Sequence, residues 1–162
     1  MKELNPKWVE IVIQFINSSP YLIHQNMKLL NLKIGESFME VELNRNHLQG
    51  YGYVHGGVYS ALIDSAGFFA AYTKVEVENS AATIEMKVNY LSSVKSGKLL
   101  AHGRCLNMGK SIGLAEASIK SENGTLLAQG LITIMVTPPI KSIESLTLPP
   151  KFRDSITKKT EP

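Results

Sequence analysis

The sequence predicts an α+β domain in which an antiparallel β-sheet wraps around one central helix. Residues 58–72 are apolar or small on every side of a helix, apart from Ser60, Asp64 and Ser65. Such a helix must be covered by protein around most of its circumference. Segments that alternate apolar and polar side chains flank it along the chain, which is typical of strands with one buried face. The 162 residues favour one domain, because two separate cores of about 80 residues each would be marginal.

The segment before the central helix contains a shorter helix and a pair of strands. Apolar residues at helical spacing from Trp8 to Ile16 predict an amphipathic helix that ends before Pro20. In residues 27–43 the period changes to two around a turn at Gly35, which predicts two strands. We therefore assign residues 1–26 to an N-terminal helix and connection, and residues 27–136 to the main domain.

The central helix is predicted from about Gly56 to Thr73, and alternating runs follow it. The first run is residues 83–90, and turns at 96–97, 107–110 and 123–124 separate it from three more. The last turn is Asn-Gly, a strong hairpin signal. Because the four strands are consecutive and joined by short links, we expect an antiparallel meander. Residues 137–162, with two Pro-Pro pairs and a basic end, are expected to form an extended or disordered tail.

Composition excludes several classes of protein. The 44% apolar fraction argues against global disorder, and the net charge of +3 is too small and scattered for a nucleic-acid footprint. No window of about 18 uncharged apolar residues is available to cross a membrane. The single cysteine, Cys105, has no intrachain partner, so a cytoplasmic location is expected. His24, His47 and His102 show no ligand spacing with each other or with Cys105, so no metal is expected.

The loop that enters the central helix ends in His55-Gly56-Gly57, and Asp64 follows two turns later. Adjacent glycines let the backbone approach a ligand, and free N–H groups of a first helical turn attract negative charge; a tight turn alone explains the glycines equally well. A carboxylate in an apolar helix is costly to bury. No Lys or Arg stands at positions 60, 61, 67 or 68 to pair with it, which favours a functional role over a structural one.

The spacing of Gly56 and Asp64 bears on assembly. Eight residues correspond to about 12 Å along a helix axis, whereas an oxyanion donor and a base or nucleophile must both lie about 3 Å from one reacting carbonyl. Two copies of the helix that run antiparallel across a two-fold axis satisfy that condition. If both residues act on one substrate, the protein is at least a homodimer.

These residues resemble the hotdog-fold acyl-CoA thioesterases, in particular the phenylacetate-pathway (PaaI) type. That family carries Asn-x-x-Gly-x-x-His-Gly-Gly followed by a helical acidic residue. The corresponding residues here are Gln49, Gly52, His55, Gly56, Gly57 and Asp64. The resemblance covers about residues 27–136 and implies the hotdog fold, an acyl-CoA substrate, and a homodimer or a dimer of dimers. It implies no cofactor, since CoA is part of the substrate.

The resemblance also implies the roles of individual residues. The Gly56 N–H polarises the thioester carbonyl, and Asp64 of the partner subunit attacks that carbonyl or activates a water. Gln49 stands where the family has Asn, as it does in related hydroxybenzoyl-CoA thioesterases, and its carboxamide positions substrate or water. Thr83 matches a hydroxyl that orients the hydrolytic water in some relatives. Phe68, one turn after Asp64, is either a core residue or a lining of the acyl pocket.

His55 and Gly57 are expected to contact substrate at the helix start. For His55, a loop-to-helix hydrogen bond that shapes the carbonyl site is favoured over direct proton transfer. Two alternatives stay open at this level. One is a non-catalytic acyl-CoA-binding hotdog protein. The other is enoyl-CoA hydration or dehydration, for which His55 and Asp64 do not have the expected spacing.

Overall fold

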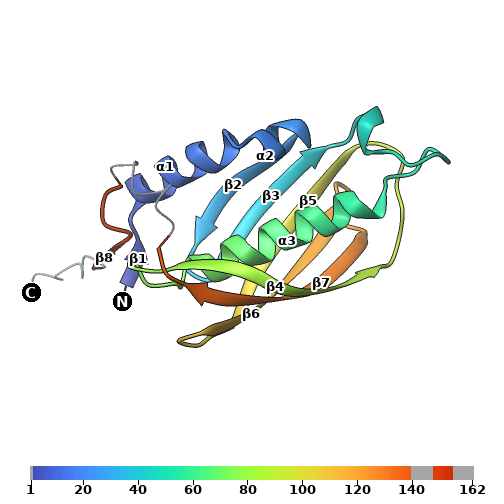
Figure 1. The fold of residues 1–162 in the computed structure, drawn as a ribbon. Helices are drawn as coiled ribbons and strands as arrows, with labels where there is room; N and C mark the ends of the chain where they lie inside the picture. The colour runs from blue at the N-terminus through green and yellow to red at the C-terminus, as the bar shows by residue number, and fades with distance from the viewer. Residues whose placement is uncertain (1, 140–147, 155–162) are drawn as a thin grey trace, which may run out of the picture.

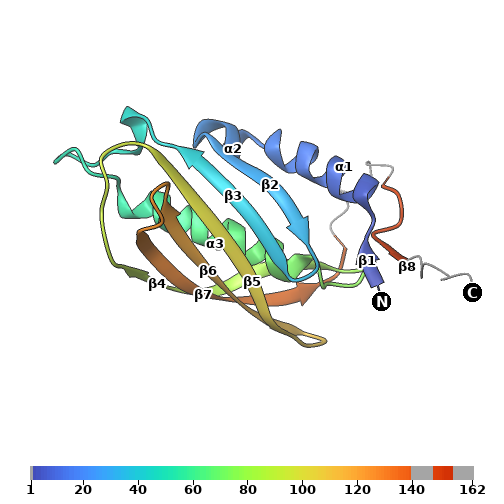
Figure 2. The ribbon, with the colours of Figure 1, turned by 180° about the vertical axis from the view of Figure 1, so that it is seen from behind.

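A computed structural model describes residues 2–139 and 148–154. A six-stranded antiparallel sheet has the order β2-β3-β5-β6-β7-β4, and α3 crosses one of its faces (Figure 1). From behind, the opposite face carries no helix (Figure 2). The predicted α+β class is confirmed. The elements are β1 (Lys2–Leu4), α1 (Pro6–Asn17), α2 (Pro20–His24), β2 (Met27–Lys33), β3 (Glu36–Glu42), a 3-10 turn (Arg45–His47), α3 (Gly56–Tyr72), β4 (Ser80–Tyr90), β5 (Lys98–Met108), β6 (Ile112–Ser121), β7 (Leu126–Thr137) and β8 (Phe152–Asp154).

The predicted N-terminal helix is α1, and it lies along the outer edge of β2. It begins after Asn5, whose side-chain oxygen accepts the Lys7 N–H at 3.1 Å. At its other end, the Asn17 carboxamide donates to the Leu29 carbonyl oxygen at 2.9 Å and accepts the Leu29 N–H at 2.8 Å. Both backbone polar groups of this edge residue are therefore satisfied by a side chain. The short elements β1 and α2 were not predicted.

The strand order differs from the predicted meander. β5, β6 and β7 are neighbours as expected, but β4 pairs with β7, and β3 lies beside β5. The reason is the path of residues 91–97, which pass the N-terminal end of α3. There the Val54 N–H donates to the Val94 carbonyl at 2.9 Å, and the Tyr59 hydroxyl donates to the Ser92 carbonyl at 3.3 Å. The link therefore carries the chain from one edge of the sheet to its middle.

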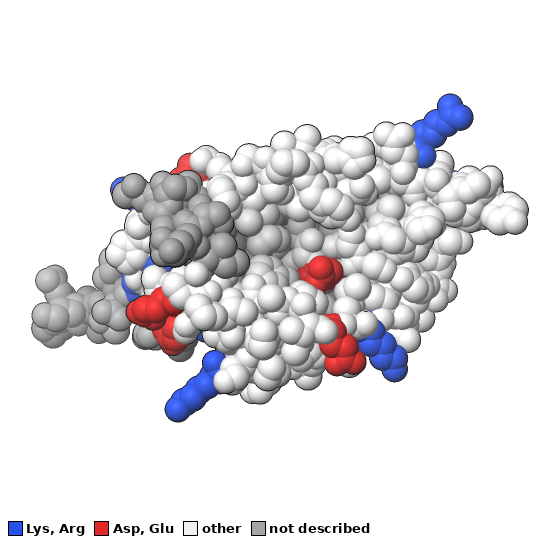
Figure 3. Space-filling view, in the orientation of Figure 1, with Lys and Arg blue, Asp and Glu red and all other residues white. Residues whose placement is uncertain are grey.

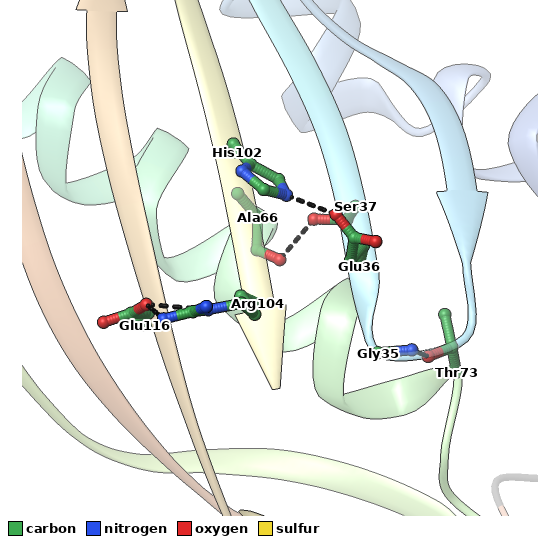
Figure 4. A network of polar contacts seen from close by, with 8 residues as sticks. All are labelled: Gly35, Glu36, Ser37, Ala66, Thr73, His102, Arg104 and Glu116. Atoms are coloured by element: carbon green, nitrogen blue, oxygen red, sulfur yellow. Dashed lines mark hydrogen bonds and ion pairs between the residues drawn. The ribbon is translucent and has the colours of Figure 1, made fainter. Parts of the chain in front are cut away.

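Close backbone approach holds α3 against the sheet (Figure 4). Ser37 donates its hydroxyl hydrogen to the Ala66 carbonyl at 2.5 Å, and the Gly35 N–H donates to the Thr73 hydroxyl at 2.7 Å. A Cβ at Gly103 would lie 2.1 Å from the Ala66 carbonyl oxygen. Only glycine fits at this crossing of helix and strand.

One stripe of α3, called the uncovered stripe below, is only partly covered by the residues that the structure describes. The sheet buries the opposite side of the helix, while α1 lies beside β2 rather than over α3. The helix is therefore enclosed around most of its circumference, as expected, and Gly57 is its only exposed residue. The half-buried residues of this stripe are Gly56, Ser60, Ala61, Asp64, Ser65, Phe68 and Tyr72.

Part of the predicted tail is packed on the domain. β8 pairs antiparallel with β1, the Asn5 N–H donates to the Lys151 carbonyl at 2.8 Å, and Lys151 is buried. Residues 148–154, which we expected to be extended or disordered, are packed on the domain, because the Tyr72 and Val75 carbonyl groups near the end of α3 bind the Lys151 ammonium. Residues 140–147 and 155–162 of the predicted tail lie outside the described residues. No helix in the described ranges is long and apolar enough to cross a membrane.

Candidate active site

The start of α3 presents a backbone N–H group that has no partner among the described residues. His55 is the N-cap: its Nδ1 accepts the Gly57 N–H at 2.8 Å, and its carbonyl accepts the Val58 N–H at 3.0 Å. Within residues 2–139 and 148–154, nothing accepts the N–H of Gly56. His55 thus makes the loop-to-helix hydrogen bond that the sequence favours over proton transfer. Its capping leaves the Gly56 N–H able to bind an oxygen atom that gains negative charge.

Asp64 and Thr83 lie together although 19 residues separate them in sequence. Thr83 Oγ1 donates to Asp64 Oδ1 at 2.8 Å, and the carboxylate is half-buried. A β-bulge between Thr83 and Glu85 interrupts the β4–β7 register, so that Thr83 and, beyond the bulge, Tyr90 both face α3. Asp64 has no ion pair in the described part of the chain. The threonine hydroxyl orients the carboxylate without neutralising it.

Tyr90 covers the first turn of α3, a role that was not predicted. Its hydroxyl lies 2.6 Å from Ser60 Oγ, and Ser60 in turn donates to the Gly56 carbonyl at 3.3 Å. A Cβ at Gly56 would lie 3.3 Å from the Tyr90 ring. The only available signal was that Tyr90 ends an alternating run whose members share one face of β4.

Gln49 is not brought to Asp64 or Thr83. It lies in the loop before α3, where its side-chain oxygen accepts the Tyr51 N–H and its backbone N–H donates to the Tyr53 carbonyl at 2.8 Å. The carboxamide oxygen is therefore used within the loop. The carboxamide NH2 has no acceptor among the described residues, so it remains a donor for a substrate.

Phe68 continues the uncovered stripe beyond Asp64 with aromatic surface. Its ring stacks on Tyr72 with a centroid distance of 5.8 Å and an interplanar angle of 11°. Burial raises the pKa of the Tyr72 hydroxyl, which keeps it neutral. Figure 3 shows a hollow in the middle of this face beside an acidic side chain, on a surface with few other charges around it. The stripe is thus mainly polar from Gly56 to Ser65 and aromatic at Phe68 and Tyr72.

His47 and His102, both outside the helix start, have structural roles. His47 is buried, with Nδ1 accepting the Asn44 N–H at 2.9 Å and Nε2 lying 2.9 Å from the Gln25 carbonyl. His102 pairs with Glu36 on the open face of the sheet (Figure 4). Across residues 2–139 and 148–154, no group of three or more His, Cys, Asp or Glu side chains could hold a metal ion.

Comparisons with known proteins agree with this architecture. Residues 51–128 match the family described as the thioesterase superfamily. A putative esterase of Saccharolobus solfataricus is 30% identical over 105 residues, which cover 65% of this chain and 69% of that protein. The 1,4-dihydroxy-2-naphthoyl-CoA hydrolase of Listeria monocytogenes is 27% identical, over 68% of this chain and 89% of the relative.

Solved structures show the same fold. A thioesterase from Haemophilus influenzae superimposes with a TM-score of 0.74 and 23% identity, over 80% of this chain and 90% of the other. A point variant of the phenylacetic acid degradation protein PaaI from Thermus thermophilus gives a TM-score of 0.67 and 26% identity, over 72% and 98% of the two chains. The chain therefore belongs to the thioesterase superfamily and has the hotdog fold of those thioesterases.

Proposed function

We propose that the protein hydrolyses acyl-CoA thioesters to a carboxylic acid and free CoA. The observation that carries the proposal is the pairing, on one helix, of an unpartnered Gly56 N–H with an Asp64 carboxylate held by Thr83, among the residues that the structure describes. The first group suits a developing oxyanion, and the second suits a nucleophile or a general base. Membership of the thioesterase superfamily and the likeness to an aryl-CoA hydrolase support the substrate class.

Two routes fit this pair of groups. In the first, an Asp64 oxygen attacks the thioester carbon, the C–S bond breaks, CoA leaves as a thiolate that takes up a proton, and water hydrolyses the resulting anhydride. In the second, Asp64 takes a proton from a water whose oxygen attacks the same carbon, and that proton ends on the CoA thiolate. In both, the Gly56 N–H donates to the carbonyl oxygen as it becomes negative, while Thr83 holds the carboxylate. The Gln49 carboxamide NH2 and the turn of His55 and Gly57 help to position the substrate.

The proposal includes a homodimer in which each site combines Gly56 of one chain with Asp64 of the partner subunit. Along one helix these residues are about 12 Å apart. β4 is an open edge, since it pairs only with β7 among the described strands, and it exposes Ile84 (52%) and Tyr90 (55%). Exposed apolar edge strands favour pairing with another strand. A second copy on this side would also cover the half-buried stripe of α3. A dimer of dimers is a further expectation, which light scattering in solution would test.

Asp64→Ala tests the reaction. With a panel of acyl-CoAs and a thiol reagent that detects free CoA, wild-type protein should release CoA and Asp64→Ala should lose at least about a hundredfold in kcat. Binding of a non-hydrolysable acyl-CoA thioether should persist in the variant. Turnover by Asp64→Ala close to that of wild type would overturn the proposal. Binding without turnover by the wild type would instead identify the non-catalytic acyl-CoA-binding alternative.

Mixing two inactive variants tests the shared site. Asp64→Ala and Gly56→Val each damage one half of every site in their own homodimers. When the two are unfolded together and refolded, a heterodimer contains one site with both defects and one intact site. Activity should therefore reappear in the mixture. If it does not, although heterodimers are detected by native mass spectrometry, both groups belong to one chain or do not act together.

A further inference from the structure

The polarity of the uncovered stripe on α3 gives the substrate a direction. On the N-terminal side of Asp64, Ser60 and the Tyr90 hydroxyl form a hydrogen-bonded pair beside Gly56. On the C-terminal side, Phe68 and Tyr72 present stacked rings. The transfer of apolar groups from water to apolar surroundings is favourable. An acyl group whose carbonyl lies at Asp64 is therefore expected to lie along the aromatic side.

This aromatic side is short. Phe68 and Tyr72 follow Asp64 by four and eight residues, so they lie about 6 and 12 Å farther along the helix axis. α3 ends at Tyr72. Phe69 packs edge-on against Phe68 at 5.4 Å, which ties the first ring to the core. An acyl group that follows the stripe reaches the end of the helix within two turns.

Lys151 occupies the end of the helix. Its Nζ donates to the Tyr72 carbonyl at 2.7 Å and to the Val75 carbonyl at 2.6 Å, and its side chain is almost completely buried, with 4% of the residue exposed. The ammonium also lies 4.7 Å from the Tyr72 ring centroid and 5.3 Å from that of Trp8. The Phe152 ring centroid lies 5.4 Å away, so two carbonyl groups and three rings hold the cation in place.

Both ends of the described chain are fastened at this point. β8 pairs with β1, and the Asn5 N–H donates to the Lys151 carbonyl at 2.8 Å. Trp8 belongs to α1, so the Lys151 side chain connects α1, the end of α3 and residues 148–154. Lys151 therefore contacts the Tyr72 ring at the end of α3, eight residues beyond Asp64.

We infer that Lys151 and Tyr72 close the far end of the acyl site, so that residues 148–154 limit the acyl group to a short chain or a single ring. The inference rests on the proposed acyl-CoA hydrolysis and specifies its substrate class. Residues 148–154 lie outside the matched family region, residues 51–128. Lys151 acts here as a specificity residue through Tyr72 and not as a participant in the reaction.

Hydrolysis of butyryl-, phenylacetyl- and palmitoyl-CoA by folded variants tests the inference. Wild type should prefer the first two substrates. Lys151→Met keeps an apolar stem but removes the ammonium, and Tyr72→Ala removes the ring while leaving the carbonyl that Lys151 binds. Each should raise the ratio of kcat/KM for palmitoyl-CoA to that for butyryl-CoA by about tenfold or more. The reason is that the additional methylene groups of the palmitoyl chain can then bind beyond position 72. Lys33→Met is the matched control, since Lys33 lies 5.3 Å from the Phe38 ring, away from α3, and its ratio should stay at the wild-type value.

The outcomes separate the two proposals. Equal hydrolysis of palmitoyl- and butyryl-CoA by the wild type overturns the length limit and leaves thioester hydrolysis standing. An unchanged ratio in both Lys151→Met and Tyr72→Ala, with native circular dichroism, overturns the role of Lys151 and Tyr72. Failure of the wild type to cleave any acyl-CoA of the wider panel removes the proposed function and this inference with it, whereas cleavage only of panel members outside these three overturns this inference alone.

Discussion

Thr83 on β4 donates a hydrogen bond to Asp64 on α3 at 2.8 Å, and this bond joins the edge strand to the uncovered stripe of the helix. Thr83→Val keeps the shape of the side chain and removes the donor. Because a hydrogen bond to a charged group contributes about 1.5–3 kcal/mol, kcat should fall by about ten- to a hundredfold, and Thr83→Ser should recover most of it.

The control for this change is Thr133→Val. The Thr133 hydroxyl also donates to a carboxylate, that of Glu85, at 3.4 Å, but it lies on the face of the sheet away from α3. Steady-state assays of the three variants should show a loss only at position 83. Equal activity of Thr83→Val and wild type would mean that the threonine does not orient Asp64 during the reaction.

Gly56→Ala should lower kcat by about tenfold with little change in stability. A methyl group there would lie 3.3 Å from the Tyr90 ring, so the ring or the first turn of α3 must move, and the N–H would leave its position for the oxyanion. Gly50→Ala, in the loop before α3, meets nothing within 4 Å and should retain wild-type kinetics. A fully active Gly56→Ala would argue against the oxyanion role.

Gly103→Ala should destabilise the fold by about 1–3 kcal/mol or more, since overpacking forces helix and sheet apart. The added methyl would lie 2.1 Å from the Ala66 carbonyl oxygen and 2.6 Å from Ser37 Oγ. Guanidinium unfolding measures the difference. Were the midpoint of Gly103→Ala to equal that of wild type, the close crossing of α3 and β5 would be relaxed in solution.

The burial of Lys151 should make stability depend on pH. Burial lowers the pKa of Lys151 to about 8, partly opposed by the charge of Glu76, whereas an unfolded lysine titrates near about 10.4. Between these values the unfolded chain binds more protons, so the free energy of unfolding rises with pH. At lower pH Lys151 is protonated in both states, so it no longer makes the free energy of unfolding depend on pH.

Lys151→Met isolates this effect from other titrating groups. Relative to the variant, wild type should gain stability between about pH 7 and pH 10, by up to about 1.4 kcal/mol for each unit of pKa shift. Unfolding free energies of both proteins across this range provide the measurement. A difference that stays constant with pH would show that the pKa of Lys151 is not lowered in the folded protein.

Local patterns in the sequence identify most elements of the fold but not all of their neighbours. The alternation through Met39 and Val41 predicts β3, and the apolar run after Gly56 predicts α3. Both are predictable because the positions that a strand or helix buries are occupied by apolar residues. The place of β4 beside β7 depends on the path of residues 91–97, which no local pattern specifies.

The candidate site shows the same division. Gly56 and Asp64 are visible in the sequence because a glycine pair and a carboxylate are unusual in an apolar helix. Thr83 is identified only through the resemblance, and its contact with Asp64 depends on a bulge. The burial of Lys151 could not be predicted from nearby residues, because a lysine in a polar segment is normally exposed to solvent. Its burial depends on carbonyl groups more than 70 residues earlier in the chain.

The side chain of Asn17 has a consequence for the size of any assembly. By filling both backbone hydrogen-bonding positions of Leu29, it leaves the β2 side of the sheet unable to recruit another strand there, while the β4 side stays open. A sheet with two such open sides could add copies without end, as in a fibre. Because the β2 edge is blocked, two copies that pair through β4 have no open edge left. Lateral addition of strands therefore ends at two copies.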